Sequence, residues 1–137
     1  MYISSVMIVY MSSEIYKFRI SYLAEQFGVF VLEQHYNKKA LHLTASNDQA
    51  PYDIEIDGLK IDVKYSQPTR ISKNKPAPYW DFDLRKKGNE YCDYLLLIGA
   101  RNGLFDSVYL VPCSDANYRR IRIPIGGISK WGVYKIR

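Results

Sequence analysis

The stretch Pro51-Tyr-Asp-Ile-Glu-Ile-Asp-Gly-Leu-Lys-Ile-Asp-Val-Lys64 alternates apolar and charged residues on both sides of the pair Asp57-Gly58. Asp-Gly between alternating segments is the strongest short-range signal for a β-hairpin with a two-residue turn. Such a turn predicts that residue 56 pairs with 59, 55 with 60, 54 with 61 and 53 with 62. Because side chains alternate along a strand, the hairpin is expected to have two different faces. The apolar face comprises Ile54, Ile56, Leu59, Ile61, Val63 and Tyr65, and the charged face comprises Asp53, Glu55, Asp57, Lys60, Asp62 and Lys64.

The charged face of this hairpin sets two carboxylates against each other. Asp53 and Asp62 are expected to face each other with Cβ atoms roughly 4.5 to 5.5 Å apart, which destabilises a strand pair. A hard divalent cation binds one or two carboxylates together with phosphate and water, so a cation would turn this repulsion into a binding site. Lys64 lies on the same face and would place a positive charge beside a bound phosphate and an attacking water. The alternative is a solvated charged face, which the pairing of Glu55 with Lys60 suits.

These residues resemble the core of the PD-(D/E)XK nuclease superfamily, which consists of an Asp, a hairpin, and then Asp or Glu, any residue and Lys. The matching residues are Asp53, Asp62 and Lys64. The wider order, over about residues 19 to 112, is most similar to the group I intron homing endonuclease branch. In that branch Gln often stands where this chain has Asp62, a departure that favours the commoner acidic version of the site. The segments that carry the wider resemblance are Leu23-Ala24-Glu25, Pro51-Tyr52-Asp53, Tyr94 to Ile98 and Val108-Tyr-Leu-Val-Pro112.

The resemblance implies a single restriction-endonuclease-like α/β domain over residues 1–137, with a mixed central β-sheet flanked by helices. It implies a DNA endonuclease that depends on Mg²⁺, for which Mn²⁺ substitutes, with the metal held by Asp53, Asp62 and Glu25. The expected partner is double-stranded DNA, cut by a homodimer or higher homo-oligomer of homing or restriction type. Two alternatives stay open: a Holliday-junction resolvase or repair nicking nuclease with the same core, and a non-catalytic nucleic-acid-binding module.

Two further residues are candidate members of the catalytic site. Residues 13 to 37 contain no Pro and carry an apolar stripe at helical spacing, which predicts a helix. Glu25 lies on the shoulder of that stripe, near Gly28, where a partner is expected to approach closely; the alternative is an ordinary glutamate at the solvent edge. Gln67 follows Lys64 by three residues. Strict alternation points Gln67 to the opposite face from Lys64, so it is either a site residue or a polar strand end.

The charge of the chain suits a nucleic-acid partner. The 137 residues carry a formal net charge of +5, and a basic balance supports phosphate binding. Much of this charge is clustered, although such clusters are also common on solvated surfaces. The first cluster contains Arg70, Lys73 and Lys75. Tyr79 and Trp80 follow it and are expected to stack or wedge against bases. The basic residues expected to bind DNA are Arg70, Lys73, Lys75, Arg85, Lys86, Lys87, Arg119 and Arg120.

The remaining residues argue against other classes of protein. Cys92 and Cys113 are too few for a disulfide framework or a zinc ribbon, and we expect buried thiols in a cytoplasmic protein. His35 and His42 have no Cys or His at ligand spacing, so a zinc site is not expected. The sequence has no run of about 18 apolar residues, so no membrane span is expected. Residues 1–12 lack the features of a signal peptide. That segment is either an extra edge strand or precedes a true start at Met11.

The rest of the chain predicts short strands and turns. Strands are expected at residues 41–45, 94–100 and 107–111, and the continuous apolar run of 94–98 suits a strand covered on both faces. Turns are expected at residues 47–50 and at Asn102-Gly103. Residues 83–89 are either a short helix or a loop. Residues 113–137 are expected to form two short strands, over 120–125 and 131–136, or one strand and a dimer arm.

Overall fold

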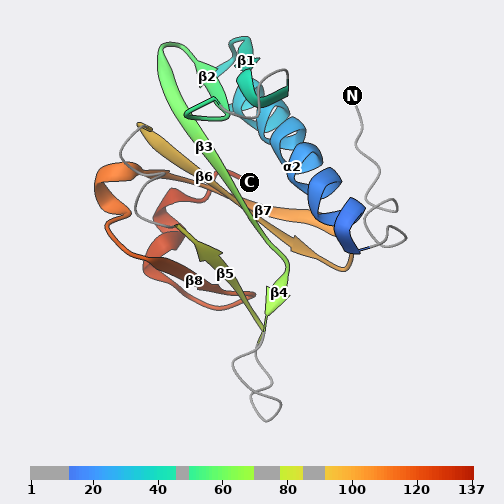
Figure 1. Cartoon of the computed structure of the whole chain (residues 1–137). Helices are drawn as coiled ribbons and strands as arrows, with labels where there is room; N and C mark the ends of the chain where they lie inside the picture. Colours follow the sequence, from blue (N-terminus) through green and yellow to red (C-terminus); the bar gives the residue numbers. More distant parts are fainter. Residues whose placement is uncertain (1–12, 46–49, 70–77, 85–91) are drawn as a thin grey trace.

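The main sheet of the protein has five strands in the spatial order β1-β2-β3-β6-β7 (Figure 1). The computed structural model describes residues 13–45, 50–69, 78–84 and 92–137. Strands β3 and β6 run parallel and the other neighbouring pairs run antiparallel, so the sheet is mixed, as predicted. The strands span Ala40–His42 (β1), Ile54–Ile56 (β2), Leu59–Ser66 (β3), Tyr94–Arg101 (β6) and Leu104–Pro112 (β7).

One long helix, α2 (Ser13–Tyr36), lies across one face of this sheet. The predicted helix is therefore confirmed. Asn37 follows it with a φ of 53°, the left-handed conformation that commonly ends a helix and that Asn tolerates. A Cβ on Gly28 would lie 2.9 Å from Leu96 Cδ2, so the close approach expected at Gly28 is also confirmed.

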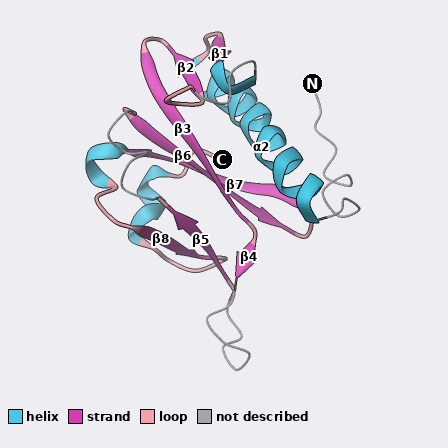
Figure 2. Cartoon of the chain, viewed as in Figure 1, coloured by secondary structure: helices cyan, strands magenta, loops and turns pink. Residues whose placement is uncertain are grey.

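A second sheet covers the opposite face, in the order β4-β5-β8. Its strands are Pro68–Thr69 (β4), Tyr79–Asp83 (β5) and Arg120–Pro124 (β8). Strand β6 lies between the two layers, because Leu96 and Ile98 pack with the helix while Leu95 and Leu97 pack with the second sheet. The expected strand buried on both faces is confirmed. In the described residues, however, the second face carries a small sheet and short 3₁₀ turns where flanking helices were predicted (Figure 2).

The C-terminal segment folds back onto its own domain. Strand β8 agrees with the prediction for 120–125, but the second predicted strand is wrong, since Lys130–Tyr134 forms a 3₁₀ helix. Trp131 is buried in the core and Lys135 bridges to Tyr109 of β7. The dimer arm stays a prediction.

Two other expectations need correction. Of the first predicted strand, 41–45, only residues 41 and 42 are extended, as part of β1; Leu43–Ala45 forms a 3₁₀ helix. Cys92 and Cys113 form a disulfide with their Cα atoms 6.4 Å apart, whereas free thiols were predicted. The physical reason is the β6–β7 hairpin, which pairs Tyr94 with Pro112 and so brings the residues just beyond that pair together. That hairpin turns at Asn102-Gly103, as predicted.

Several predictions fall outside the described residues. These are the edge strand or alternative start in residues 1–12, most of the turn at 47–50 and most of the segment 83–89. Within the described part of the chain, no helix is long and apolar enough to cross a membrane.

Candidate active site

The β2–β3 hairpin positions the candidate site with the predicted register. Ile54 pairs with Ile61, Glu55 with Lys60 and Ile56 with Leu59. Positive φ angles at Asp57 (53°) and Gly58 (78°) are the conformation that a two-residue type I′ turn requires. The local sequence thus determines which residues of β3 face the helix and which face away from it.

The regular pairing stops just before Asp53, and this break creates the site. The Asp53 N–H donates to the Ile61 carbonyl at 3.1 Å, and the Asp53 carboxylate accepts the Val63 N–H at 2.7 Å. Asp53 thus turns toward β3 where β2 has ended. The predicted direct pairing of Asp53 with Asp62 is absent from the described ladder, which ends at Ile54 and Ile61. The two carboxylates are nevertheless close enough for each to affect the other's pKa.

Burial raises the pKa of both carboxyl groups. For Asp62 burial is the largest cause, Lys64 acts in the opposite direction and Asp53 adds to the rise, which brings the pKa to about 6. Burial also raises the pKa of Asp53, the Val63 N–H opposes it, and Glu25 adds to it. Two mostly buried carboxyl groups with raised pKa values are a common signature of a functional site.

Lys64 offsets only part of the cost of burying the Asp62 carboxylate. Its Nζ lies 3.1 Å from Asp62 Oδ2, but that buried oxygen has no hydrogen-bond partner among the described residues. The contact is therefore an ion pair without a well-directed hydrogen bond. Lys64 keeps a side-chain exposure of 27% against 14% for Asp62, so its ammonium group can reach a molecule that arrives from solvent.

The strand that carries this pair is open on one side. Within the described residues β2 pairs with β3 only as far as Ile61, whereas β6 pairs with β3 from Ile61 to Ser66. Asp62 and Lys64 therefore lie on the part of β3 that β2 leaves uncovered.

Glu25 reaches the site from the helix with two partners that the sequence interpretation missed. His42 Nε2 lies 2.7 Å from Glu25 Oε1, and the Thr44 hydroxyl donates to the same oxygen at 2.5 Å. Both contacts use Oε1. Thr44 also lies close enough to Asp53 to lower the pKa of that carboxyl group, so it lies beside both carboxylates. One sequence signal could have pointed to His42. Side chains alternate along a strand, so Ala40 and His42 lie on the same face of β1.

The donor set fits a divalent cation held by two carboxylates. Among the described residues, no group of three or more His, Cys, Asp or Glu side chains is arranged to hold a metal ion. Asp53 and Asp62 offer two neighbouring carboxylates, and one of their oxygens lacks a hydrogen bond among the described residues. Mg²⁺ commonly uses one or two carboxylates and takes its other ligands from phosphate and water, so the pair suffices. Glu25 as a third ligand stays a prediction.

Other predicted site residues lie elsewhere or differ in role. Gln67 is exposed immediately after β3, and its carbonyl accepts the Ser66 and Thr69 hydroxyls; its predicted catalytic role stays a prediction. Arg119 and Arg120 are exposed, and Arg120 pairs with Asp81 at 2.8 Å. The other predicted DNA-binding cations, Arg70, Lys73, Lys75, Arg85, Lys86 and Lys87, lie outside the described residues.

The prediction that Tyr79 and Trp80 stack on bases is wrong in this structure. Trp80 is 2% exposed, and its indole N–H donates to the Ala100 carbonyl at 2.7 Å. Gly99 leaves space for the indole, since a Cβ there would lie 2.4 Å from it. Tyr79 is 9% exposed beneath the Arg122 guanidinium. Both aromatic rings belong to the packed domain because β5 forms the middle strand of the second sheet.

Comparison with known proteins finds a similar fold in a solved structure. No family model matches the chain, and no curated protein sequence matches it. A solved structure described as that of a bacterial homing endonuclease, I-Ssp6803I, superimposes with a TM-score of 0.61 at 20% sequence identity, covering 92% of this chain and 88% of that one. The chain therefore has the fold of that bacterial homing endonuclease, a mixed sheet with a helix packed on it.

Proposed function

We propose that this protein is a metal-dependent endonuclease that hydrolyses phosphodiester bonds in DNA. The observation that carries the proposal is the Asp62–Lys64 ion pair beside Asp53 on an uncovered strand. An Asp62 oxygen is buried there without a hydrogen bond, and burial raises the pKa of both carboxyl groups. The likeness to a homing endonuclease fold supports the same conclusion. The type of enzyme we favour is a homing or restriction endonuclease.

Asp53 and Asp62 would hold one or two Mg²⁺ ions, with Glu25 as a further ligand through Oε2. Bound Mg²⁺ supplies Lewis acidity toward a phosphoryl oxygen and lowers the pKa of a coordinated water. The Val63 N–H fixes one oxygen of Asp53, so this carboxylate is oriented before substrate arrives. His42 and Thr44 likewise fix one oxygen of Glu25.

Lys64 has a separate role in this proposal. Its ammonium group would stabilise the negative charge that develops on the phosphoryl oxygens as the bond breaks, which is worth most in a site that excludes water. The Asp62 carboxylate holds Nζ at 3.1 Å, so the charge is already placed. Gln67 would orient the water or a phosphate from the strand end.

The test is cleavage of supercoiled plasmid by the purified protein in Mg²⁺, Mn²⁺ or EDTA. We expect metal-dependent nicking or linearisation, and discrete products would indicate a site-specific enzyme. If plasmid stays intact but four-way junctions are cut, the resolvase alternative is correct. Intact plasmid, junctions and RNA together with no metal binding would overturn the nuclease proposal in favour of a binding module.

A homodimer is part of the proposal, because one site hydrolyses one bond and cutting both strands of a duplex requires two sites. Sedimentation of the protein with and without duplex DNA tests this. A monomer that nicks one strand only would support the repair-type alternative.

A further inference from the structure

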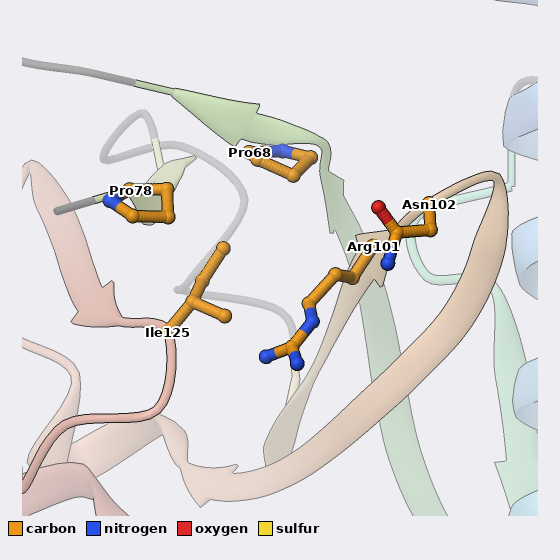
Figure 3. Close-up of a pocket in the computed structure, with 5 residues that line it drawn as sticks. All are labelled: Pro68, Pro78, Arg101, Asn102 and Ile125. Atoms are coloured by element: carbon orange, nitrogen blue, oxygen red, sulfur yellow. The ribbon is translucent and has the colours of Figure 1, made fainter. Parts of the chain in front are cut away.

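A pocket lies at the opposite end of β3 from the candidate active site (Figure 3). Its volume is about 310 Å³, at the small end of the range typical of ligand sites. Strands β3 and β6 are parallel, and both end beside the pocket: β3 leads into Pro68, and Arg101 is the last residue of β6. Ligands of open α/β sheets bind beyond the carboxyl ends of such strands. The lining residues are Pro68, Pro78, Arg101, Asn102 and Ile125.

The walls of the pocket combine a flat apolar surface with one planar cation. Figure 3 shows the Arg101 side chain extending from the strand end toward Ile125, with the rings of Pro68 and Pro78 beside the same opening. Among the described residues, no carboxylate forms an ion pair with Arg101. With respect to the described residues, the fork of N–H donors on the guanidinium is therefore available to a ligand. Asn102 adds an amide that both donates and accepts.

This chemistry selects among possible ligands. A bare phosphate requires donors on several sides, but three of the five lining side chains are apolar, and prolines have no backbone N–H to offer. A purely apolar ligand would leave the Arg101 charge without a partner. A flat ring with two acceptors on one edge satisfies both requirements. Guanine presents O6 and N7 in the spacing that an arginine fork binds.

We propose that this pocket binds a guanine base of the nucleic-acid substrate. The inference rests on the proposed function for the source of the base, since it takes DNA as the ligand. A base that enters this pocket must leave its stack, so an unpaired or extruded guanine is the occupant.

The position of the pocket separates it from the cleavage chemistry. Six residues of extended chain lead from Asp62 to Pro68, which corresponds to roughly 20 Å. Duplex DNA that runs along β3 spans about six base pairs over that length. The bound guanine is therefore not the nucleotide that is cut, and Arg101 determines which DNA binds.

The experiment measures binding in EDTA, where no cleavage occurs. The probes are GMP, AMP, ribose 5-phosphate and inorganic phosphate by calorimetry, and a labelled oligo(dT) with or without one central dG by fluorescence anisotropy. We expect GMP to bind best and the single dG to tighten oligonucleotide binding. Arg101→Ala should weaken both effects by about tenfold, and Arg101→Lys should restore little because lysine lacks the planar fork.

Lys135→Ala, at an exposed residue outside the pocket, is the matched control and should bind like the wild type. Asn102→Gly keeps the positive φ of 55° while it removes the amide, and it should reduce GMP affinity less than Arg101→Ala does. Thermal unfolding of each variant shows whether the fold is intact.

Equal affinity for phosphate and GMP, or for AMP and GMP, would overturn the proposal. So would an Arg101→Ala variant that binds like the wild type. If GMP binds but the single dG has no effect on oligonucleotide binding, the guanine does not come from the nucleic-acid substrate. The ligand is then a free nucleotide, which overturns the proposal. Failure of the proposed nuclease activity would appear separately, as plasmid left intact in Mg²⁺.

Discussion

Lys64 Nζ lies 3.1 Å from Asp62 Oδ2, two residues earlier on the same strand. Strand alternation places the two side chains on one face, and the same short segment therefore supplies both a carboxylate and a cation. Asp53 raises the pKa of Asp62, whereas Lys64 lowers it. A like charge and an opposite charge thus act on Asp62 together, and the loss of either neighbour should change the pKa of Asp62.

We expect Lys64→Ala to lower plasmid cleavage by about 10² to 10³-fold, the usual cost of removing one group that stabilises transition-state charge. DNA binding should fall much less, because Lys64 is one cation in a chain of net charge +5. The measurements are cleavage rate and equilibrium DNA binding.

The matched control is Lys60→Ala, on the same strand and the same face but opposite Glu55. It should cleave nearly as fast as the wild type. Equal loss of folding in the Lys64 and Asp62 variants would mark the pair as structural and contradict a catalytic role.

Asp62→Asn should abolish cleavage and yet stabilise the protein at pH 8. The pKa of Asp62 is about 6 in the folded protein against an ordinary value of 3.8, so between these pH values the folded state binds more protons than the unfolded state. Through this group, stability rises as pH falls from about 6 to 4, and the ionised carboxylate costs the folded state on the order of 2 to 3 kcal/mol above pH 6.

Urea unfolding in EDTA at pH 4.5 and pH 8 measures both parts of this prediction. The variant should gain stability chiefly at pH 8, and its stability should depend less on pH. A variant that is less stable than the wild type at pH 8 would show that the ionised carboxylate supports the fold.

Mg²⁺ or Mn²⁺ should raise the melting temperature of the wild type but not that of Asp62→Asn. A ligand that binds only the folded state stabilises it by about 2.7 kcal/mol at a hundred times its Kd. Burial disfavours the charge of both wild-type carboxylates, so a cation relieves a cost that is smaller in the variant. Equal shifts in both proteins would place the metal elsewhere.

Elements determined by neighbouring residues could be predicted from the sequence. The hairpin register follows from Asp57-Gly58 and the alternation around it, and the buried strand β6 follows from one apolar run. The same locality explains why Asp62 and Lys64 were identified together. Helical periodicity alone was enough to select Glu25 as a candidate site residue.

Features that depend on distant contacts could not be predicted in this way. From its neighbours in the sequence, Trp80 could stack on bases. In the fold, β8 pairs with β5 and the Trp80 ring packs against Gly99. Cys92 and Cys113 are 21 residues apart, and only the antiparallel pairing of β6 with β7 brings them together. His42 meets Glu25 only because β1 lies under α2, which neither segment indicates by itself.

His42→Ala should lower the cleavage rate by about tenfold while DNA affinity stays unchanged, as expected for a residue that positions a ligand. Its Nε2 lies 2.7 Å from Glu25 Oε1, and loss of this contact leaves Thr44 alone to orient the carboxylate. Glu25→Gln should be more severe. His35→Ala is the control, because His35 is exposed near the end of the same helix; a similar loss there would show a nonspecific effect.

Gly28→Ala tests how tightly the helix is seated on the sheet. The added Cβ would lie 2.9 Å from Leu96 Cδ2 and 3.4 Å from Ile54 Cδ1, and overpacking of this kind costs about 1 to 3 kcal/mol. Alanine favours a helix by about 1 kcal/mol over glycine, so the expected net change is a modest loss of stability. Gly132→Ala is the matched control, since a Cβ there meets nothing within 4 Å. Because Glu25 is one turn away on α2, displacement of the helix by Gly28→Ala should also slow cleavage, whereas a stabilised and fully active variant would show that the helix moves aside without disturbing the site.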